Sequence, residues 1–312
     1  MPFSRGERSD PGRCLYLFPA APLLDLPAVG VVAAGRPADG LAMITGMLPV
    51  GITVAAVTWS WVNREERRAV NDPCSRWVVA RMSPDARGLV LVFDVNETLT
   101  DMTALGARLE DAGLSVGLLP QWFAGVLRDG IALTLAGGRA PFAQVAGDGL
   151  RTLLARERPE RDPEPLVEHV LAGLSELPVH PDVPGGVRAL HAAGHRLATL
   201  TNGSVDTTRA VLTRAGLADC FEAHLDVQGA GGRWKPAAAA YAHALGALDV
   251  PAASALLVAV HPWDIDGASR AGLRTAWLRR TPVPYPSALR PADLEATGVT
   301  DLARRLGRSV AG

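Results

Sequence analysis

A carboxylate stands at the end of an apolar run in the segment VLVFDVNETLTD, residues 90–101. Asp94 follows four apolar residues, and Asn96 lies two residues further on. An aspartate can attack an electrophile as a covalent nucleophile. An amide cannot give a proton to a leaving group, whereas an acid at the same place could. The segment therefore favours a nucleophile that acts on a leaving group needing no proton; the alternative is that Asn96 only makes a turn.

Polar residues follow apolar runs at three later places, which are Thr201 and Asn202 in LTNGS, Lys235 in GGRWKP, and Asp264 in AVHPWDIDG. Taken singly, each is as readily a helix cap, a turn or a solvated charge. Their joint arrangement is what indicates an active site.

The chemistry of these residue types is complementary. An ammonium from Lys235 beside Asp94 would lower the pKa of the carboxyl and keep it ionised. Thr201 could donate a hydrogen bond, and the turn formed by Asn202 and Gly203 could offer backbone N–H groups to an anion. Asp264 could orient a water or hold a cation.

The elements that must position these residues alternate. Short apolar runs typical of buried strands lie at residues 88–93, 196–200 and 255–260, with weaker ones at 224–227 and 275–278. Helical patterns lie between them at residues 183–193, 204–215, 236–248 and 265–271. The alternation predicts an α/β fold with a doubly wound parallel sheet. Carboxyl ends of parallel strands share one edge, so the polar sites should meet in one crevice.

One long insertion interrupts the alternation. Residues 102–180 have helical patterns, at 104–112, 119–135, 141–155 and 164–174, and no convincing strand. A parallel crossover needs only about a dozen residues. We therefore expect a helical cap domain at 102–180, folded over the strand ends to exclude water. The core domain would comprise residues 85–101 and 181–312.

The first part of the chain has a different character. Pro and Gly interrupt every apolar run in residues 1–84, so we expect a poorly ordered extension, with Met82 a sensible start for the domain that follows. Residues 40–63 carry no charge, and about 20 apolar residues can span a bilayer. A membrane anchor and a packed accessory segment are the less favoured alternatives, because Gly46 and Pro49 dilute the apolar stretch.

Bulk properties limit the partners and the compartment. A formal net charge of −1 over 312 residues gives no reason to expect nucleic acid. Cys14, Cys74 and Cys220 show neither metal-ligand spacing nor an even disulfide framework, which favours the cytoplasm. We expect a small-molecule substrate and no membrane partner, and a homodimer stays open.

The motifs FDVNETL, LTNGS, KP and WDIDGA resemble, in order and spacing, the four motifs of the haloacid dehalogenase superfamily. The resemblance runs from Leu89 to about Leu306, with the cap where that family inserts one. It is strongest to the 2-haloacid dehalogenases that act on the S substrate, often called type II. KPAAAAY and PWD place a tyrosine and a tryptophan where those enzymes have them, and LPQWFAGVLRDG resembles their cap helix.

The resemblance implies a mechanism without a cofactor. Asp94 would attack the carbon that bears the halogen and form an ester, with Lys235 neutralising it. Thr201 and Asn202 would orient the nucleophile and the substrate carboxylate, and Asp264 would position the hydrolytic water. Thr98 and Gly203 would have structural roles at the site. The residues expected to contact substrate are Asn96, Trp122, Phe123, Arg128, Tyr241, His261 and Trp263.

The recognition residues depart from the family pattern. Phe123 follows the cap tryptophan where the family has an arginine, and Arg128 lies a little over one turn further along the helix. Ala259 and His261 replace a serine and an asparagine. His261 could bind an anion, relay a proton, ligate a metal or simply be half-buried. The aromatic residues could wall an apolar pocket or belong to the core.

Two other functions stay open. A magnesium-dependent phosphatase would bind its cation with Asp94, the Asn96 carbonyl and Asp264, which are the oxygen ligands that Mg²⁺ prefers. A non-catalytic binding protein would keep the fold and lose the chemistry through changes such as Phe123.

Overall fold

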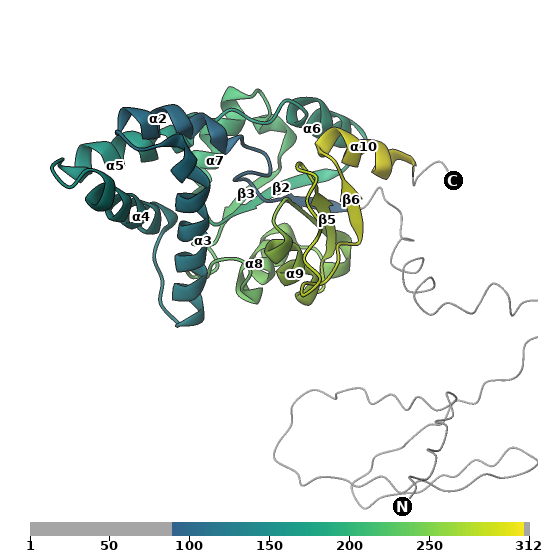
Figure 1. The fold of residues 1–312 in the computed structure, drawn as a ribbon. Coiled ribbons are helices and arrows are strands. Elements are labelled where there is room, and N and C mark those ends of the chain that lie inside the picture. Colours follow the sequence, from purple (N-terminus) through teal and green to yellow (C-terminus); the bar gives the residue numbers. More distant parts are fainter. Residues whose placement is uncertain (1–88, 309–312) are drawn as a thin grey trace, which may run out of the picture. The chain divides into compact units, whose positions relative to one another are not determined.

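The computed structural model describes residues 89–308 and contains the doubly wound parallel sheet that the sequence predicts. The predicted extension at residues 1–84 and the uncharged stretch at 40–63 lie outside the described residues. Six parallel strands run in the order β3-β2-β1-β4-β5-β6 (Figure 1). They are β1 (Val90–Phe93), β2 (Arg196–Thr201), β3 (Ala223–Asp226), β4 (Ala255–Ala259), β5 (Arg274–Leu278) and β6 (Leu294–Ala296).

Strand β1 lies in the middle of the sheet. Its four residues are buried, and Phe93 pairs with Thr199 of β2 on one side and with Val258 of β4 on the other. The backbone N–H of Asp94 donates to the Val258 carbonyl at 3.0 Å. The strand order reverses between β1 and β4, which is where open α/β sheets bind ligands. Asp94 therefore stands at the switch point of the sheet.

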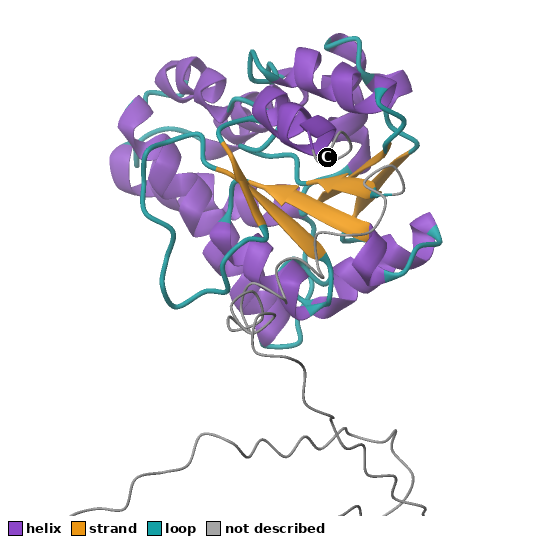
Figure 2. Ribbon diagram, turned by 90° about the vertical axis from the view of Figure 1, so that its right-hand side faces the viewer, coloured by secondary structure: helices purple, strands orange, loops and turns teal. Residues whose placement is uncertain are grey.

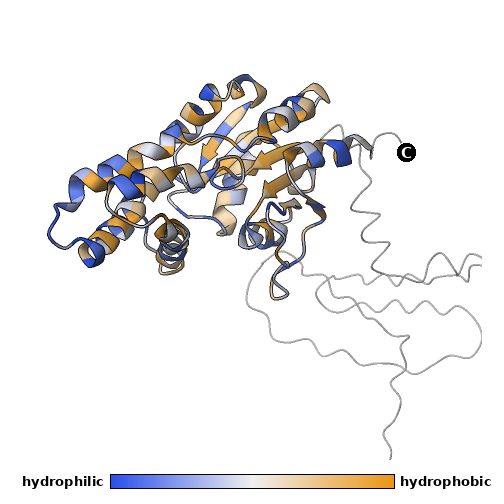
Figure 3. Cartoon of the chain, turned by 45° about the horizontal axis from the view of Figure 1, so that its top comes forward, coloured by the Kyte–Doolittle hydropathy of each residue, from blue (hydrophilic) through white to orange (hydrophobic). Residues whose placement is uncertain are grey.

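Helices cover both faces of the sheet (Figures 1 and 2). One face carries α6 (Val183–Ala192), α7 (Val205–Arg214) and α10 (Val299–Arg308), and the other carries α8 (Ala238–Leu248) and α9 (Pro262–Arg270). Side chains alternate across a strand, so Leu91 and Phe93 pack with the first group while Val90 and Val92 pack with the second. Figure 3 accordingly shows hydrophobic strands between helices of mixed character.

Two elements near the carboxyl end are absent from the sequence-based prediction. Strand β6 has only three residues at the sheet edge, too few for an alternating pattern, and α10 follows directly behind it. Helix α9 begins at Pro262, earlier than the predicted 265, because the strand-end residues already enter its first turn. No helix within residues 89–308 is both long and apolar enough to cross a bilayer.

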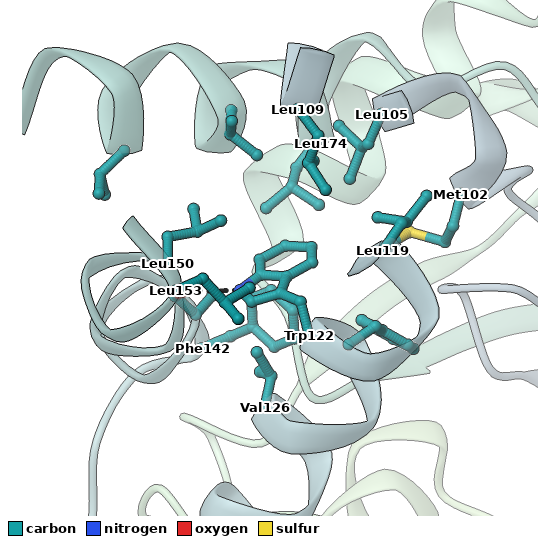
Figure 4. Packing of buried hydrophobic residues seen from close by; sticks show 14 of the residues in the cluster. Met102, Leu105, Leu109, Leu119, Trp122, Val126, Phe142, Leu150, Leu153 and Leu174 are labelled. Atoms are coloured by element: carbon teal, nitrogen blue, oxygen red, sulfur yellow. Dashed lines mark hydrogen bonds between the residues drawn. The ribbon is translucent and has the colours of Figure 1, made fainter. Parts of the chain in front are cut away.

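The cap between β1 and α6 packs around a hydrophobic cluster that continues into the core domain through Val211, Val227, Trp234 and Ala240. Its helices are α2 (Gly106–Asp111), α3 (Leu119–Leu135), α4 (Phe142–Glu157) and α5 (Pro163–Ala172). Figure 4 shows Trp122 of α3 in the middle of this core, with Leu109, Leu150 and Leu174 around it. The indole N–H of Trp122 donates to the Ala146 carbonyl at 3.0 Å, which joins α3 to α4.

Trp234 fastens the cap to the core. Its ring stacks on Phe142 at a centroid distance of 5.7 Å, and its indole N–H donates to the Ala140 carbonyl at 3.0 Å. Its backbone N–H donates to Thr134 Oγ1 at 3.1 Å. Gly130 of α3 passes so close to the indole that an added Cβ would overlap the ring. The residue after this anchor is Lys235.

A matched pair of substitutions tests this contact. We expect Gly130→Ala to lower the free energy of unfolding by about 1–3 kcal/mol through overpacking against Trp234. Gly246→Ala lies in α8, where an added Cβ meets no atom of the described chain within 4 Å. That change should raise the free energy of unfolding by about 0.5–1 kcal/mol, because alanine is the better helix former. Urea denaturation measures both, and equal effects of the same sign would refute the contact.

Candidate active site

Asp94 has both carboxylate oxygens held. Its side chain is 6% exposed, Oδ1 lies 2.7 Å from Lys235 Nζ, and Oδ2 accepts a hydrogen bond from Thr98 Oγ1 at 2.7 Å. Thr98 Oγ1 accepts in turn from the backbone N–H of Val260 at 3.1 Å, which directs its proton to Asp94. Burial by itself raises the pKa of Asp94, but the Lys235 ammonium and these hydrogen bonds bring it below the ordinary value. Asp94 is therefore an ionised carboxylate at a strand end.

Lys235 lies between two carboxylates. Its side chain is fully buried, and Nζ is 2.7 Å from Asp94 Oδ1 and 2.7 Å from Asp264 Oδ2. Burial by itself lowers the pKa of the ammonium, but the two anions raise it above the ordinary value. Asn202 holds the Lys235 backbone, because its Oδ1 accepts from the lysine N–H at 2.8 Å and its Nδ2 donates to the lysine carbonyl at 3.4 Å. The Asn202 side chain thus positions the lysine.

Asp264 is enclosed on all sides. It lies in the first turn of α9 with a fully buried side chain, and Oδ1 accepts from the Tyr241 hydroxyl at 2.6 Å while Oδ2 faces Lys235. Burial, together with the Asp94 charge, raises the pKa of Asp264, and burial likewise raises the pKa of Tyr241. The predictions that Asp264 positions water and that Tyr241 contacts substrate are therefore corrected, since each is occupied by the other.

Thr201 lies next to the nucleophile and does not hold it. Its Oγ1 accepts from the Gly203 N–H at 2.9 Å, and the hydroxyl that reaches the nucleophile is that of Thr98. Thr201, Gly203 and Asn96 line a cavity of about 170 Å³, which Phe142 and other cap residues close from above. The sequence analysis gave Thr201 the orienting role that Thr98 fills.

Three rings gather on the other side of Asp94. His261 caps the start of α9, and its Nε2 lies 3.7 Å from Asp94 Oδ2. Its ring stacks on Trp263 at 5.0 Å between centroids and faces Phe123 at 6.5 Å. Phe123 is buried. Phe123 and Trp263 therefore enclose His261 with apolar surface beside the nucleophile.

Two expected substrate contacts, Trp122 and Arg128, line a different cavity, of about 600 Å³, in the cap. Trp122 is inside the cap core with its N–H bonded to Ala146. The Arg128 side chain is 75% exposed and forms a two-bond pair with its neighbour Asp129. Five residues along a helix are a rotation of about 140° from one another, so with Phe123 turned inward Arg128 faces outward.

Glu97 is a site residue that the sequence analysis missed. Its Oε2 lies 3.6 Å from His261 Nε2, and its carbonyl accepts from His180 Nε2 at 3.0 Å. Its φ is 61°, in the left-handed region that non-glycine residues rarely adopt. Burial raises the pKa of Glu97. Glu97 was visible in the sequence as an acidic residue inside FDVNETL. Its contact with His261 was not, because the two residues lie far apart in the sequence.

The Lys235 ammonium stands among the ligands of the alternative magnesium site. That site would use Asp94, the Asn96 carbonyl and Asp264, and the ammonium lies 2.7 Å from each of the two carboxylates. Within residues 89–308 no group of three His, Cys, Asp or Glu side chains is arranged to hold a metal. A second cation between the same two oxygens would meet the lysine charge.

The geometry of a strand-end aspartate paired with a lysine under a helical cap agrees with a family model. The haloacid dehalogenase-like hydrolase model matches residues 89–272. The chain belongs to this family. The predicted superfamily is thereby confirmed, and the protein is a hydrolase.

Relatives within the family differ in their reactions. The chain is 29% identical over 223 residues to (S)-2-haloacid dehalogenase 1 of Pseudomonas sp. (strain CBS-3), covering 70% of this chain and 96% of that protein. It is 31% identical over 240 residues to a phosphoserine phosphatase of Thermus thermophilus, covering 67% and 92%. A 100-residue match, 37% identical, covers 32% of this chain and 44% of haloacetate dehalogenase H-2 of Moraxella sp..

A solved structure has the same fold. The L-2-haloacid dehalogenase of Xanthobacter autotrophicus with chloropropionic acid covalently bound matches with a TM-score of 0.64 and 25% identity, covering 70% of this chain and 98% of that one. The family therefore includes both dehalogenases and phosphatases.

Removing the lysine should expose the electrostatics of the site. We expect Lys235→Met to lower the free energy of unfolding by about 3–5 kcal/mol at pH 7, because two buried carboxylates lose their counter-charge. The deficit should shrink as the pH falls toward 5. The unpaired carboxylates then have raised pKa values, so the folded variant binds protons that the unfolded chain does not.

In the native protein Asp94 contributes a dependence of the opposite sign, and at lower pH. Asp94 has a lowered pKa, so its contribution to stability is present above its unfolded value and is lost as the pH falls through the folded one. Urea denaturation of both proteins at pH 7 and pH 5 measures the variant's deficit, because the Asp94 contribution of the native protein changes only below its ordinary pKa of 3.8. A deficit independent of pH would mean that Lys235 contributes packing alone.

Proposed function

We propose that this protein is a 2-haloacid dehalogenase that acts on short substrates of the S configuration through an ester of Asp94. The carboxylate attacks the carbon that bears the halogen, the carbon–halogen bond breaks, and the halide leaves with the bonding pair. Water then cleaves the ester, releasing a 2-hydroxy acid and restoring Asp94. The observation that carries the proposal is an ionised Asp94, held by Lys235 and Thr98, with an amide two residues later.

The amide favours halide over phosphate as the group displaced. An alkoxide is a poor leaving group near neutral pH and gains about 10²–10⁴-fold in rate from a positioned acid. Asn96 offers no such proton, whereas a halide needs none.

The surroundings of Asp94 suit a small substrate. The cavity beside it, lined by Asn96, Thr201 and Gly203, measures about 170 Å³. Pockets for drug-sized ligands are larger, at about 300–1,000 Å³. We assign the hydroxyl and amide groups on one wall of this cavity, which apolar cap residues close, to the substrate carboxylate, and the apolar surface of Phe123 and Trp263 to the carbon bearing the halogen.

The relatives support the covalent step and motivate the control. A similar L-2-haloacid dehalogenase has been solved with chloropropionic acid covalently bound. Another relative is a phosphoserine phosphatase, so phosphate release must be measured beside halide release.

Halide release from (S)-2-chloropropionate, with and without EDTA, tests the proposal. We expect turnover that EDTA does not reduce. Asp94→Asn should leave the fold intact and keep less than about a hundredth of the activity, since removal of a nucleophile costs far more than that. Phosphate release from p-nitrophenyl phosphate that depends on Mg²⁺ would favour the phosphatase, and neither activity would favour a binding protein.

Labelling with ¹⁸O-water shows whether Asp94 attacks the substrate directly. In a single turnover with excess enzyme in ¹⁸O-water, the heavy oxygen should enter the Asp94 carboxyl, because water attacks the ester at its carboxyl carbon. Mass spectrometry of the peptide containing FDVNETL measures it. Label found in the hydroxy acid alone would make Asp94 a general base.

Asn96→Asp tests the interpretation of the amide. We expect no gain in halide release, because a carboxylate near Asp94 raises the nucleophile's pKa. Weak phosphatase activity should arise, since the substitution supplies the missing acid. Efficient, Mg²⁺-dependent phosphate release by the unaltered protein would refute our interpretation of Asn96.

A further inference from the structure

Hydrolysis of an ester on Asp94 requires a base that can reach water, and Asp264 is not placed to be that base. Its side chain is fully buried, one oxygen accepts from Tyr241 at 2.6 Å, and the other lies 2.7 Å from Lys235. A general base must come within hydrogen-bond reach of the water it deprotonates. Asp264 holds the lysine in place instead, so the hydrolytic step needs another group.

His261 lies beside the nucleophile and lines a cavity. Its Nε2 is 3.7 Å from Asp94 Oδ2, too far for a direct hydrogen bond but within reach of a water that approaches the Asp94 carboxyl carbon. The same Nε2 is 3.6 Å from Glu97 Oε2. One imidazole nitrogen therefore faces both the reacting carboxyl and a second carboxylate, and stacking on Trp263 fixes the ring.

Water has its own route to this pair. A cavity of about 370 Å³ is lined by Glu97, His261, Val260 and Trp277, and basic, acidic, hydroxyl and apolar side chains complete its wall. The Glu97 side chain is 43% exposed. The cavity lies at the β4 and β5 ends of the sheet, on a different side of Asp94 from the one that Asn96 and Thr201 line. Substrate and water can thus approach Asp94 from different sides.

The backbone at Glu97 is held in an unfavourable conformation. A φ of 61° suits glycine and strains a residue with a Cβ. The hydrogen bond from His180 to the Glu97 carbonyl keeps it there. Strain of this kind persists where the surrounding structure imposes it, and often at functional sites. Here it places a carboxylate against His261.

We propose that His261 is the general base for hydrolysis of the Asp94 ester and that Glu97 is its positioning residue. His261 Nε2 takes a proton from water as the hydroxide adds to the Asp94 carboxyl carbon. The ester bond then breaks, and the departing hydroxy-acid oxygen receives that proton. Glu97, whose carboxylate faces the same nitrogen at 3.6 Å, stabilises the imidazolium between the two transfers by its charge. The inference rests on the proposed ester mechanism and adds the residues for its second half.

The decisive experiment follows the ester itself. In His261→Gln, halide should be released in a burst of one equivalent per enzyme, with steady turnover at least about 100-fold slower. Intact-mass spectrometry of the quenched enzyme should show the substrate acid attached to Asp94. His191→Gln, an exposed change on α6, is the matched control and should turn over normally without accumulating ester.

Two variants at position 97 separate function from folding. Glu97→Gln keeps the side-chain size, and ester hydrolysis should slow by about tenfold. Glu97→Gly also removes the carboxylate but relieves the strained φ. It should therefore accumulate ester while its unfolding temperature is no lower than that of the unaltered protein. Slow hydrolysis in a fully stable variant is something a merely structural residue would not produce.

Other outcomes would overturn the inference. If His261 only binds substrate, His261→Gln will raise KM and slow the halide burst without any attached acid. Normal turnover in His261→Gln, or in both variants at position 97, would exclude the pair from hydrolysis. Failure of the unaltered protein to release halide would instead refute the proposed dehalogenase function, so the two failures are distinguishable.

Discussion

The site depends on one buried ammonium between two buried carboxylates. Lys235 is the only lysine in the chain, beside 30 arginines. A guanidinium is planar and forked, whereas an ammonium is a compact charge with three donors, which suits a position 2.7 Å from both Asp94 and Asp264. Much of the surrounding architecture keeps this charge in place. Asn202 holds the Lys235 backbone, and Trp234, the residue before Lys235, is bonded to the cap.

The same ammonium separates the two carboxylates into different roles. Asp94 has a lowered pKa and lies beside residues that line two cavities at the strand ends, whereas Asp264 has a raised pKa and a fully buried side chain. Carboxylates whose environments drive their pKa values apart commonly divide the work of a site between them. Asp94 can react because Asp264 is confined to holding Lys235.

The parts of the site that follow from local pattern were predictable from the sequence. Buried strands show as apolar runs, and the residues just beyond them, such as Asp94 and Lys235, fall at one edge by topology alone. The rotation of α3 about its axis was not predictable, because its sequence pattern does not say which aromatic residue faces the core. For that reason Arg128 was expected at the substrate, whereas its side chain is exposed. The Thr98 bond and the Glu97 conformation depend on backbone angles in a loop, which residue types alone do not specify. Tyr241 was found by its motif, but its partner became evident only from the packing of α8 against α9.

The solitary lysine has a practical consequence. Among the side chains of this protein, a reagent that acylates amines has one target, which is Lys235. The Lys235 side chain is fully buried. Acylation must wait for a fluctuation that frees the nitrogen from both anions. The residue before Lys235, Trp234, contacts α3 of the cap. The rate of acylation at Lys235 Nζ would thus report how often this buried site opens, without any engineered label.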